Sequence, residues 1–299
     1  MSARGGSLWA DAWRRWRRHR VSVASAVVLV GVVLFCGPGP LLVEKALGWT
    51  YEMQDIRLGA TPPALVHPFG TDVLGRDVMV RTMHGGRVSL LVALVATAVS
   101  LVVGVSYGAI SGYVGGRVDA AMMRLVDLML STPYLLLVIV LMAVIPPSDV
   151  AIAGMDGSFV LMFAALGLVS WLMLARIVRG QVLALREREF VEAARAIGVH
   201  PLRILSRHIV PNTLGPVIVY STLTIPSVML SEAFLSFLGL GIREPQASWG
   251  TLVNDGANAM VVYPWLILFP GLTMALTLFC LNFLGDGLRD ALDPTDRDL

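Results

Sequence analysis

Six segments of the sequence are long and apolar enough to cross a lipid bilayer as α-helices. They lie at residues 21–37, 88–111, 125–145, 159–178, 213–238 and 264–285. A helix needs about 20 apolar residues to cross about 30 Å of hydrocarbon, and backbone in that region must satisfy its own hydrogen bonds. The alternating pattern of a membrane barrel does not occur in these segments. The sequence therefore predicts an all-α integral membrane protein with six transmembrane helices.

The composition agrees with a membrane protein. Hydrophobic residues make up 56% of the chain and charged residues 15%, with a mean hydropathy of +0.73, whereas a soluble domain carries about 25% charged residues. The net charge of +2 indicates neither a nucleic-acid partner nor an acidic substrate. Cys36 and Cys280 lie in apolar segments, and their placement indicates neither a disulfide framework nor a metal site.

The basic residues are distributed unevenly between the connecting segments. Of the 23 lysine and arginine residues, 17 lie in the N-terminal segment, the second and fourth connections and the C-terminal segment, and six lie on the opposite side. Because lysine and arginine accumulate on the cytoplasmic side, we expect both termini in the cytoplasm. The first apolar segment ends at residues 37–40, Gly-Pro-Gly-Pro, without a small-residue cleavage site, which predicts an uncleaved anchor.

Tryptophan and arginine residues are concentrated before this anchor. Trp9, Trp13 and Trp16 recur at helical spacing and form one face, and five arginines form a basic face: Arg14, Arg15, Arg17, Arg18 and Arg20. This pattern predicts a helix that lies on the surface of an anionic membrane. A basic and aromatic nucleic-acid site is the less favoured alternative, because the segment adjoins a membrane span.

Small residues and prolines indicate where the helices pack or bend. In the second apolar segment, every fourth residue from Ala96 to Gly112 is small, which predicts close approach of another helix. Prolines inside the later segments are expected to kink these helices. The kinks either outline a translocation path or serve helix packing alone. They are Pro133, Pro216, Pro226 and Pro270.

The basic connection between the fourth and fifth segments has its own helical pattern. Residues 186–198 and the stretch that ends at Pro211 predict two short helices, with Gly198 ending the first and Pro201 starting the second. Phe190, Val191, Ala194 and Ile197 are expected on one face. By spacing alone, a connecting helix on the bilayer surface is favoured over a protein-docking site. The small Ala193 and Ala194, which suit a partner's groove, favour the second interpretation.

No pattern for nucleotide binding or metal binding occurs in the chain. A G-x-x-x-x-G-K-[ST] phosphate loop needs a lysine, and the single lysine, Lys45, follows Glu44. The five histidines have no metal-binding spacing. We therefore expect this chain to bind no cofactor, and any ATP to bind elsewhere.

The short connection resembles a known loop. Glu192-Ala193-Ala194, three further residues, Gly198 and then Pro211 are similar to the cytoplasmic EAA loop of binding-protein-dependent ABC importers. His208 and Val210 depart from the usual isoleucine and leucine of that pattern. In that family the loop docks the ATPase. The resemblance implies that Glu192, Ala193, Ala194, Arg195 and Gly198 couple the chain to an ATPase.

Further segments narrow the resemblance to the C-type permease subunit of oligopeptide and dipeptide importers. They are residues 70–77 with 87–90, 235–241, 248–250 and 285–294. The resemblance implies an anchor helix plus a five-helix type I importer core, divided as 1–87, 88–287 and a cytoplasmic tail at 288–299. It also implies a homologous B-type permease in a heterodimer, two ATPase subunits that hold ATP and Mg, an external peptide-binding protein and a bacterial or archaeal inner membrane. A permease for nickel or another small solute is the alternative within this pattern.

Four charged residues are candidates for the translocation path or its gate. Glu232 lies at membrane depth, where an ionisable group is costly and by default functional; it is expected either to contact a peptide's amino terminus or to make a structural pairing. For Asp72, Arg76 and Asp77, a capped surface helix that begins at Thr71 or Asp72 is favoured. A role in gating or in receiving the binding protein is the alternative.

Two other classes of protein fit the sequence less well. A secondary transporter driven by an ion gradient is disfavoured, because no internal repeat is evident and few charges lie in the apolar segments. An intramembrane enzyme would need a nucleophile with a base, or paired carboxylates, at membrane depth, and none stands out. The sequence therefore favours a non-catalytic permease subunit.

Overall fold

The structure is a computed structural model that describes residues 8–145 and 157–292. The regular structure of these residues is helical, apart from one isolated β-bridge between Thr71 and Asp77. The last residues of the expected cytoplasmic tail, 293–299, lie outside the described part. The helices are α1 (Leu8–Arg18), α2 (Arg20–Cys36), α3 (Gly39–Leu47), α4 (Val78–Val114), α5 (Gly116–Ser131), α6 (Tyr134–Val144), α7 (Gly157–Arg186), α8 (Glu189–Ala196), α9 (Pro201–Ile204), α10 (Leu214–Phe237), α11 (Trp249–Ala259) and α12 (Trp265–Leu292).

Long apolar helices confirm the predicted membrane fold. Four helical stretches of the described chain are long and apolar enough to cross a membrane, at Val78–Val114, Phe159–Arg186, Pro201–Phe237 and Trp265–Leu292. Two bent helix pairs raise the number to six when each pair is counted as one span. These pairs are α1 with α2, bent by 88°, and α5 with α6, bent by 83°.

The bend between α5 and α6 has the cause that the sequence predicts. Thr132 is extended (φ −86°, ψ 134°) because the ring of Pro133 disfavours helical backbone in the residue before it. The third apolar segment is therefore two helices and not one straight span. Pro226 and Pro270 lie inside α10 and α12, whereas Pro216 lies in the first turn of α10, where a missing N–H costs little.

The small-residue stripe of α4 packs against α7, as predicted. A β-carbon built on Gly108 would lie 2.3 Å from the carbonyl oxygen of Ala175, and one on Gly104 would lie 3.0 Å from the β-carbon of Leu174. Ser100 adds a hydrogen bond from its hydroxyl to the carbonyl oxygen of Ser170, 2.9 Å long. The two backbones approach this closely only because the α4 side chains are small.

A polar turn joins the anchor helix to the bundle. His19 caps α2, and its Nδ1 accepts the N–H of Ser22 at 3.2 Å. The hydroxyl of Ser22 donates to the carbonyl oxygen of Phe283 on α12 at 2.7 Å. A β-carbon on Gly287 of α12 would collide with the Ser22 side chain, so the two helices lie close together here. Before this turn, α1 carries the predicted aromatic face: the rings of Trp13 and Trp16 stack with centroids 5.0 Å apart. Contact of this face with lipid stays a prediction.

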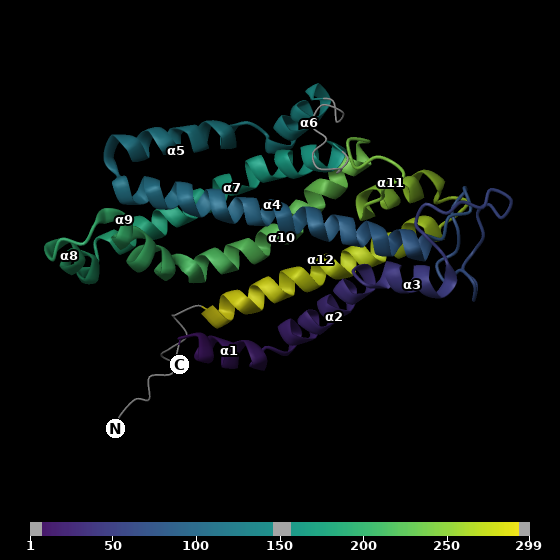
Figure 1. Cartoon of the computed structure of the whole chain (residues 1–299), viewed down its shortest axis with the longest axis horizontal. Helices are drawn as coiled ribbons and strands as arrows, with labels where there is room; N and C mark the ends of the chain where they lie inside the picture. Colours follow the sequence, from purple (N-terminus) through teal and green to yellow (C-terminus); the bar gives the residue numbers. More distant parts are fainter. Residues whose placement is uncertain (1–7, 146–156, 293–299) are drawn as a thin grey trace.

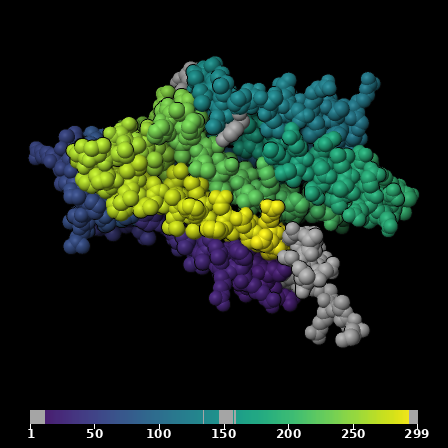
Figure 2. Space-filling view, turned by 180° about the vertical axis from the view of Figure 1, so that it is seen from behind, coloured from purple at the N-terminus to yellow at the C-terminus, as the bar shows by residue number. Residues whose placement is uncertain are grey.

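The elements gather at two ends of the bundle. Figure 1 shows α8, α9, α1 and the C-terminal end of α12 toward one end, and α3, α11 and the connection before α4 at the other. In the reverse view, α12 and α10 cover one face and α2 runs along its edge (Figure 2). The segments expected in the cytoplasm therefore share one end of the molecule, and we call this the inner end and the opposite one the outer end.

Candidate functional sites

The predicted pair of short helices forms a corner at the inner end. The first, α8, stops at Gly198, which adopts a left-handed backbone (φ +78°). The N–H of Val199 then returns to the carbonyl oxygen of Ala194 at 3.0 Å, a bond typical of a glycine-terminated helix. The second, α9, begins at Pro201 and is capped by the Nδ1 of His200, which accepts the N–H of Leu202 at 3.3 Å. These helices, their glycine stop and their proline start are as predicted.

The corner is anchored by two side chains and leaves its larger apolar side chains exposed. Val191 and Ala194 are buried, in a cluster with residues of α4, α7, α9 and α10. Phe190 is 42% exposed and Ile197 is 80% exposed. Of the four residues expected on one face, only Val191 and Ala194 are therefore covered by the bundle, and Ile197 follows the last helical residue.

The predicted coupling residues surround this exposed surface. Glu192, Ala193, Arg195 and Gly198 are exposed, and Ala194 is buried beneath them. The guanidinium of Arg195 lies over the ring of Tyr113 on α4, 5.8 Å from its centroid. The five residues are thus brought together at one corner, held to the bundle from below and open above. Such a surface offers contacts to a partner and no catalytic chemistry.

A tight turn precedes α4 at the outer end and contains the other charged candidates. One Asp72 oxygen, Oδ1, accepts the N–H groups of Leu74 and Arg76, both at 2.9 Å, and Oδ2 accepts Nε of Arg76 at 2.6 Å. The helix itself is capped by Asp77, whose Oδ1 accepts the N–H of Val80 at 2.8 Å. The expectation that a helix begins at Thr71 or Asp72 is therefore wrong, because Asp72 closes its own turn and Asp77 caps α4 by accepting the N–H of Val80.

Arg76 links this turn to the connection before α11. Its Nη1 donates to Oε1 of Glu244 at 2.9 Å. Burial by itself lowers the pKa of Arg76, but the hydrogen bonds and charges of Asp72 and Glu244 outweigh burial and hold the pKa above its ordinary value. The other oxygen of Asp77, Oδ2, pairs with Nδ1 of His67 at 2.8 Å. The three predicted residues are therefore paired and largely buried at the outer end.

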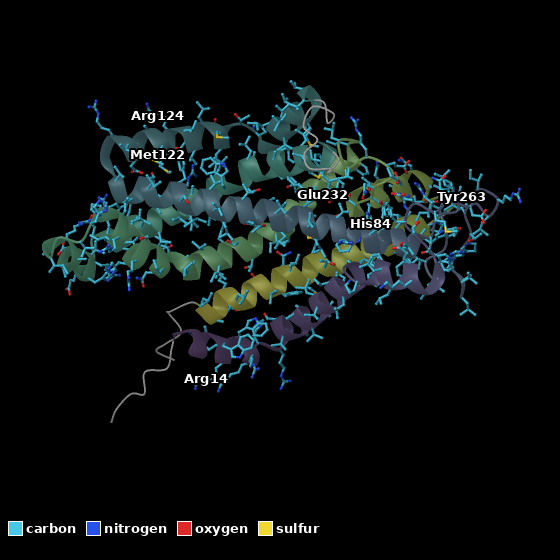
Figure 3. The ribbon with its side chains drawn as sticks, viewed as in Figure 1. Arg14, His84, Met122, Arg124, Glu232 and Tyr263 are labelled. Atoms are coloured by element: carbon cyan, nitrogen blue, oxygen red, sulfur yellow. The ribbon has the colours of Figure 1, made fainter. Side chains whose placement is uncertain are left out.

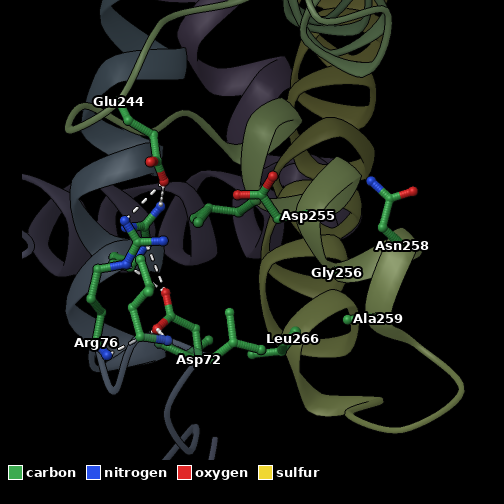
Figure 4. A pocket seen from close by; sticks show the side chains of 13 residues that line it. Asp72, Arg76, Glu244, Asp255, Gly256, Asn258, Ala259 and Leu266 are labelled. Atoms are coloured by element: carbon green, nitrogen blue, oxygen red, sulfur yellow. Dashed lines mark hydrogen bonds and ion pairs between the residues drawn. The ribbon is translucent and has the colours of Figure 1, made fainter. Parts of the chain in front are cut away.

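A cavity of about 460 Å³ opens beside this turn. Figure 4 shows Arg76 between Asp72 and Glu244, with Asp255 of α11 opposite them. Arg81 of α4 also lines it, together with a neighbouring cavity of about 230 Å³. Sequence analysis missed Arg81, Glu244 and Asp255 as site residues. The three lie far apart in the chain and belong to no motif, so only the folded chain brings them together.

Glu232 lies inside the bundle. It is 1% exposed, and its carboxylate accepts the hydroxyls of Ser89 at 3.0 Å and Ser236 at 2.8 Å. Ser89 in turn accepts the N–H of Trp249 at 3.1 Å. The network joins α4, α10 and α11, and Figure 3 places Glu232 among the packed helices. In this conformation, Glu232 makes the structural pairing that was one of its two predicted roles, with serines as its partners.

A third cavity, of about 400 Å³, lies at membrane depth between α5, α7 and α10. None of its lining side chains is charged. Hydroxyl groups line it next to aliphatic ones, on α10 from Tyr220, Thr224, Ser227 and Ser231 and on α7 from Ser170. Such a lining can hydrogen-bond a polar solute without a fixed charge.

No cluster of three or more histidine, cysteine, aspartate or glutamate side chains in residues 8–145 and 157–292 is arranged to hold a metal ion.

Comparison with known proteins identifies the family. A profile described as the inner membrane component of binding-protein-dependent transport systems matches residues 104–297, and one for the N-terminal transmembrane domain of oligopeptide transport permease C matches residues 7–63. The chain is 48% identical to the oligopeptide transport system permease protein OppC of Haemophilus influenzae, over 99% of this chain and 92% of that one.

Two further relatives agree over nearly the whole length. The protein of the same name from Escherichia coli K12 is 50% identical over 99% of this chain and 94% of that one. The dipeptide transport system permease protein DppC of Bacillus subtilis is 41% identical over 97% of this chain and 87% of that one. The chain therefore belongs to the family of inner membrane components of binding-protein-dependent transport systems, whose members are transport subunits and not enzymes.

Proposed function

We propose that this chain is the permease subunit of an ATP-driven importer and forms half of a transmembrane path for peptides. Relatives named for oligopeptide and dipeptide transport, each matched over nearly its full length, support the peptide substrate. The uncharged, hydroxyl-lined cavity between α5, α7 and α10 supports it too, because peptides of different side-chain charge share only their polar backbone. A homologous B-type permease supplies the other half of the path.

The observation that carries the proposal is the corner of α8 and α9. Its buried side chains tie it to α4, α7 and α10, so a push on the corner is passed to the bundle as a rigid-body movement. Phe190 and Ile197 are exposed to water, which is unfavourable for apolar side chains. Burial of the two side chains in a partner's groove removes this unfavourable exposure. Glu192, Ala193, Ala194, Arg195 and Gly198 couple this chain to the ATPase through this surface.

The proposal assigns each remaining task to a separate partner. Two ATPase subunits hold ATP and Mg and dock at the inner end, which lies in the cytoplasm with both termini. An external peptide-binding protein delivers substrate at the outer end of a bacterial or archaeal inner membrane. There the paired Asp72, Arg76 and Asp77 hold the start of α4 in a fixed position for gating. The division into residues 1–87, 88–287 and 288–299 is part of the same proposal.

Transport by the complete complex tests the proposal. Vesicles that contain this chain, its partner permease and the ATPases, with the binding protein outside, should accumulate labelled tri-alanine only when ATP is enclosed with the ATPases. An ionophore should not stop uptake, because no ion gradient drives it. Uptake that requires an ion gradient and ignores ATP would contradict the proposal.

Substitutions at the corner test the coupling role. Ile197→Glu, Glu192→Lys and Gly198→Trp should each reduce uptake about tenfold or more, because they place charge or bulk in the docking surface. Ile197→Glu should leave the fold intact, since this side chain is 80% exposed. Asp290→Lys reverses a charge on the exposed surface of α12 at the same end and serves as the control. If the three corner variants transport as well as the control does, the corner is not the coupling surface.

A further inference from the structure

The charged groups that line the outer cavity are not balanced. Three carboxylates, of Asp72, Glu244 and Asp255, face two guanidinium groups, of Arg76 and Arg81, so the lining carries one excess negative charge. Asp72 and Glu244 both form ion pairs with Arg76: Nε lies 2.6 Å from Oδ2 of Asp72, and Nη1 lies 2.9 Å from Oε1 of Glu244. Within the described residues, the carboxylate of Asp255 has no hydrogen bond and no ion pair, and it is exposed. Asp255 is therefore an acceptor available to a ligand.

Arg81 is the opposite case, a buried donor that the protein leaves incompletely paired. Its residue surface is 2% exposed, and its Nη1 has no hydrogen-bond partner among the described residues. The nearest carboxylate oxygens lie 3.9 Å and 4.0 Å from its other nitrogens, on Asp72 and Glu244, too far for a hydrogen bond. A buried N–H group without a partner is destabilising, and a ligand oxygen can remove that penalty.

From these two groups we infer that the outer cavity is a binding site for the amino-terminal end of a peptide. The α-ammonium pairs with Asp255 and neutralises the excess charge, and the first carbonyl oxygen accepts from Arg81. In a peptide these two groups flank one α-carbon, so a single residue presents both. A bare metal cation suits the cavity less well. Arg81 would repel it, and the cation would bring no acceptor atom for the unpaired N–H group of Arg81. The inference rests on the proposed peptide substrate, and it adds a recognition site on the permease itself.

Other parts of the cavity fit a bound peptide. The cavity volume of about 460 Å³ exceeds what one amino-terminal residue fills and lies within the range of small-ligand sites. Leu252, Ala259 and Leu266 provide apolar wall next to the charged groups, and Asn258 adds a polar one. Such a lining accepts a first side chain without selecting for its charge.

Equilibrium binding to the permease without the binding protein tests the inference directly. The probe is tri-alanine with a fluorophore attached through a carboxy-terminal amide, and the second probe is the same peptide with an acetylated amine. The intact complex of both permeases and the ATPases, held in lipid nanodiscs, should bind the free-amine probe about tenfold more tightly than the acetylated one, since only the first carries the charge.

Two variants separate the roles of the two groups. Asp255→Asn should weaken binding of the free-amine probe about tenfold and leave the acetylated probe unchanged. Arg81→Lys should weaken both probes to the same extent, because both keep the first carbonyl group. Glu44→Gln, which removes a charge from the exposed surface of α3 at the same end, serves as the matched control and should change neither. Copurification of the partner subunits shows that each variant is assembled.

Several results would overturn the inference. They are equal binding of the two probes, failure of the permease complex to bind either, or tighter binding of an acetylated tri-alanine that carries a free carboxylate. Reduced uptake by Asp255→Asn with unchanged binding would show that Asp255 moves in gating and does not hold the peptide. ATP-dependent uptake by the unmodified transporter is measured alongside. If that uptake is normal, a negative binding result refutes only the inference, and if it is absent, the proposed function fails.

Discussion

At the scale of single residues, the structure shows how a carboxylate inside a membrane-spanning helix, Glu232, is accommodated. A buried carboxylate is destabilising unless hydrogen bonds replace its water. Glu232 receives two, from Ser89 and Ser236, and Ser89 is fixed in turn by the backbone of Trp249. The residue therefore joins three helices at one point. A contact with substrate would need these hydrogen bonds to break.

Substitution of Glu232 should affect stability before it affects transport. Glu232→Ala leaves two buried hydroxyls without their acceptor and should lower the free energy of unfolding by about 1–3 kcal/mol. Glu232→Gln keeps one acceptor oxygen and the shape, so its loss should be smaller. A thiol-reactive dye measures unfolding of the purified chain, because Cys36 and Cys280 are buried until it unfolds. If Glu232→Gln unfolds like the unmodified protein but abolishes uptake, Glu232 contacts substrate or gates the path.

At the scale of helices, the contact of α4 with α7 depends on residues that lack bulk. In lipid, association of helices gains little from the hydrophobic effect, so close packing must supply the stability. Small side chains from Ala96 to Gly112 allow that packing along one stripe of α4. At Thr132 and Pro133 the chain bends instead of packing as one straight helix, because the proline separates α5 from α6 and sets the angle between them.

A single added methyl group tests the contact of α4 with α7. Gly108→Ala places a β-carbon 2.3 Å from a backbone oxygen of α7, so the helices must separate, and the free energy of unfolding should fall by about 1–3 kcal/mol. Gly180→Ala on α7 is the matched control, because no atom lies within 4 Å of its added β-carbon. It should be neutral or slightly stabilising, since alanine favours a helix more than glycine does. Equal unfolding midpoints for the two variants would contradict the proposed packing.

At the scale of the whole molecule, the two candidate sites lie at opposite ends of one helical bundle. The corner of α8 and α9 is held to the inner end by α4, α7 and α10. The outer cavity is built from the turn before α4, from α4, from the connection before α11, from α11 and from the start of α12. The single helix α4 runs from the outer turn to the packing surface near the corner. One continuous helix, tightly packed against α7, therefore joins the two ends.

Thiol labelling tests the predicted orientation of these ends. Arg188→Cys at the corner should react with a membrane-impermeant maleimide in inside-out vesicles and not in intact cells. Val66→Cys, at a residue 62% exposed in the outer connection, should show the reverse. The native Cys36 and Cys280 contribute little labelling because both are buried. Labelling of both positions from the same side would refute the orientation.

Much of the fold and of the inner corner could be predicted because local chemistry determines them. Hydrophobic length predicts the spans, and the stop at Gly198 and the start at Pro201 depend on the backbone preferences of those residues alone. The spacing could not tell that Phe190 and Ile197 stay exposed while Val191 and Ala194 are buried, because exposure depends on which neighbours cover a helix. Asp72 was taken for a helix cap because its side chain suits both a cap and a turn. Only the partner Arg76 and the next carboxylate, Asp77, decide between them.

The sequence by itself determined that this protein lies in a membrane, its helical class, its likeness to importer permeases and the two short helices of the inner corner. Each of these follows from residues that are neighbours in the chain. The tertiary structure alone decided that Glu232 is a buried structural link and that Arg81, Glu244 and Asp255 share a cavity. These residues come from α4, from the connection after α10 and from α11. Charge balance in a cavity is a property of the groups that folding brings together.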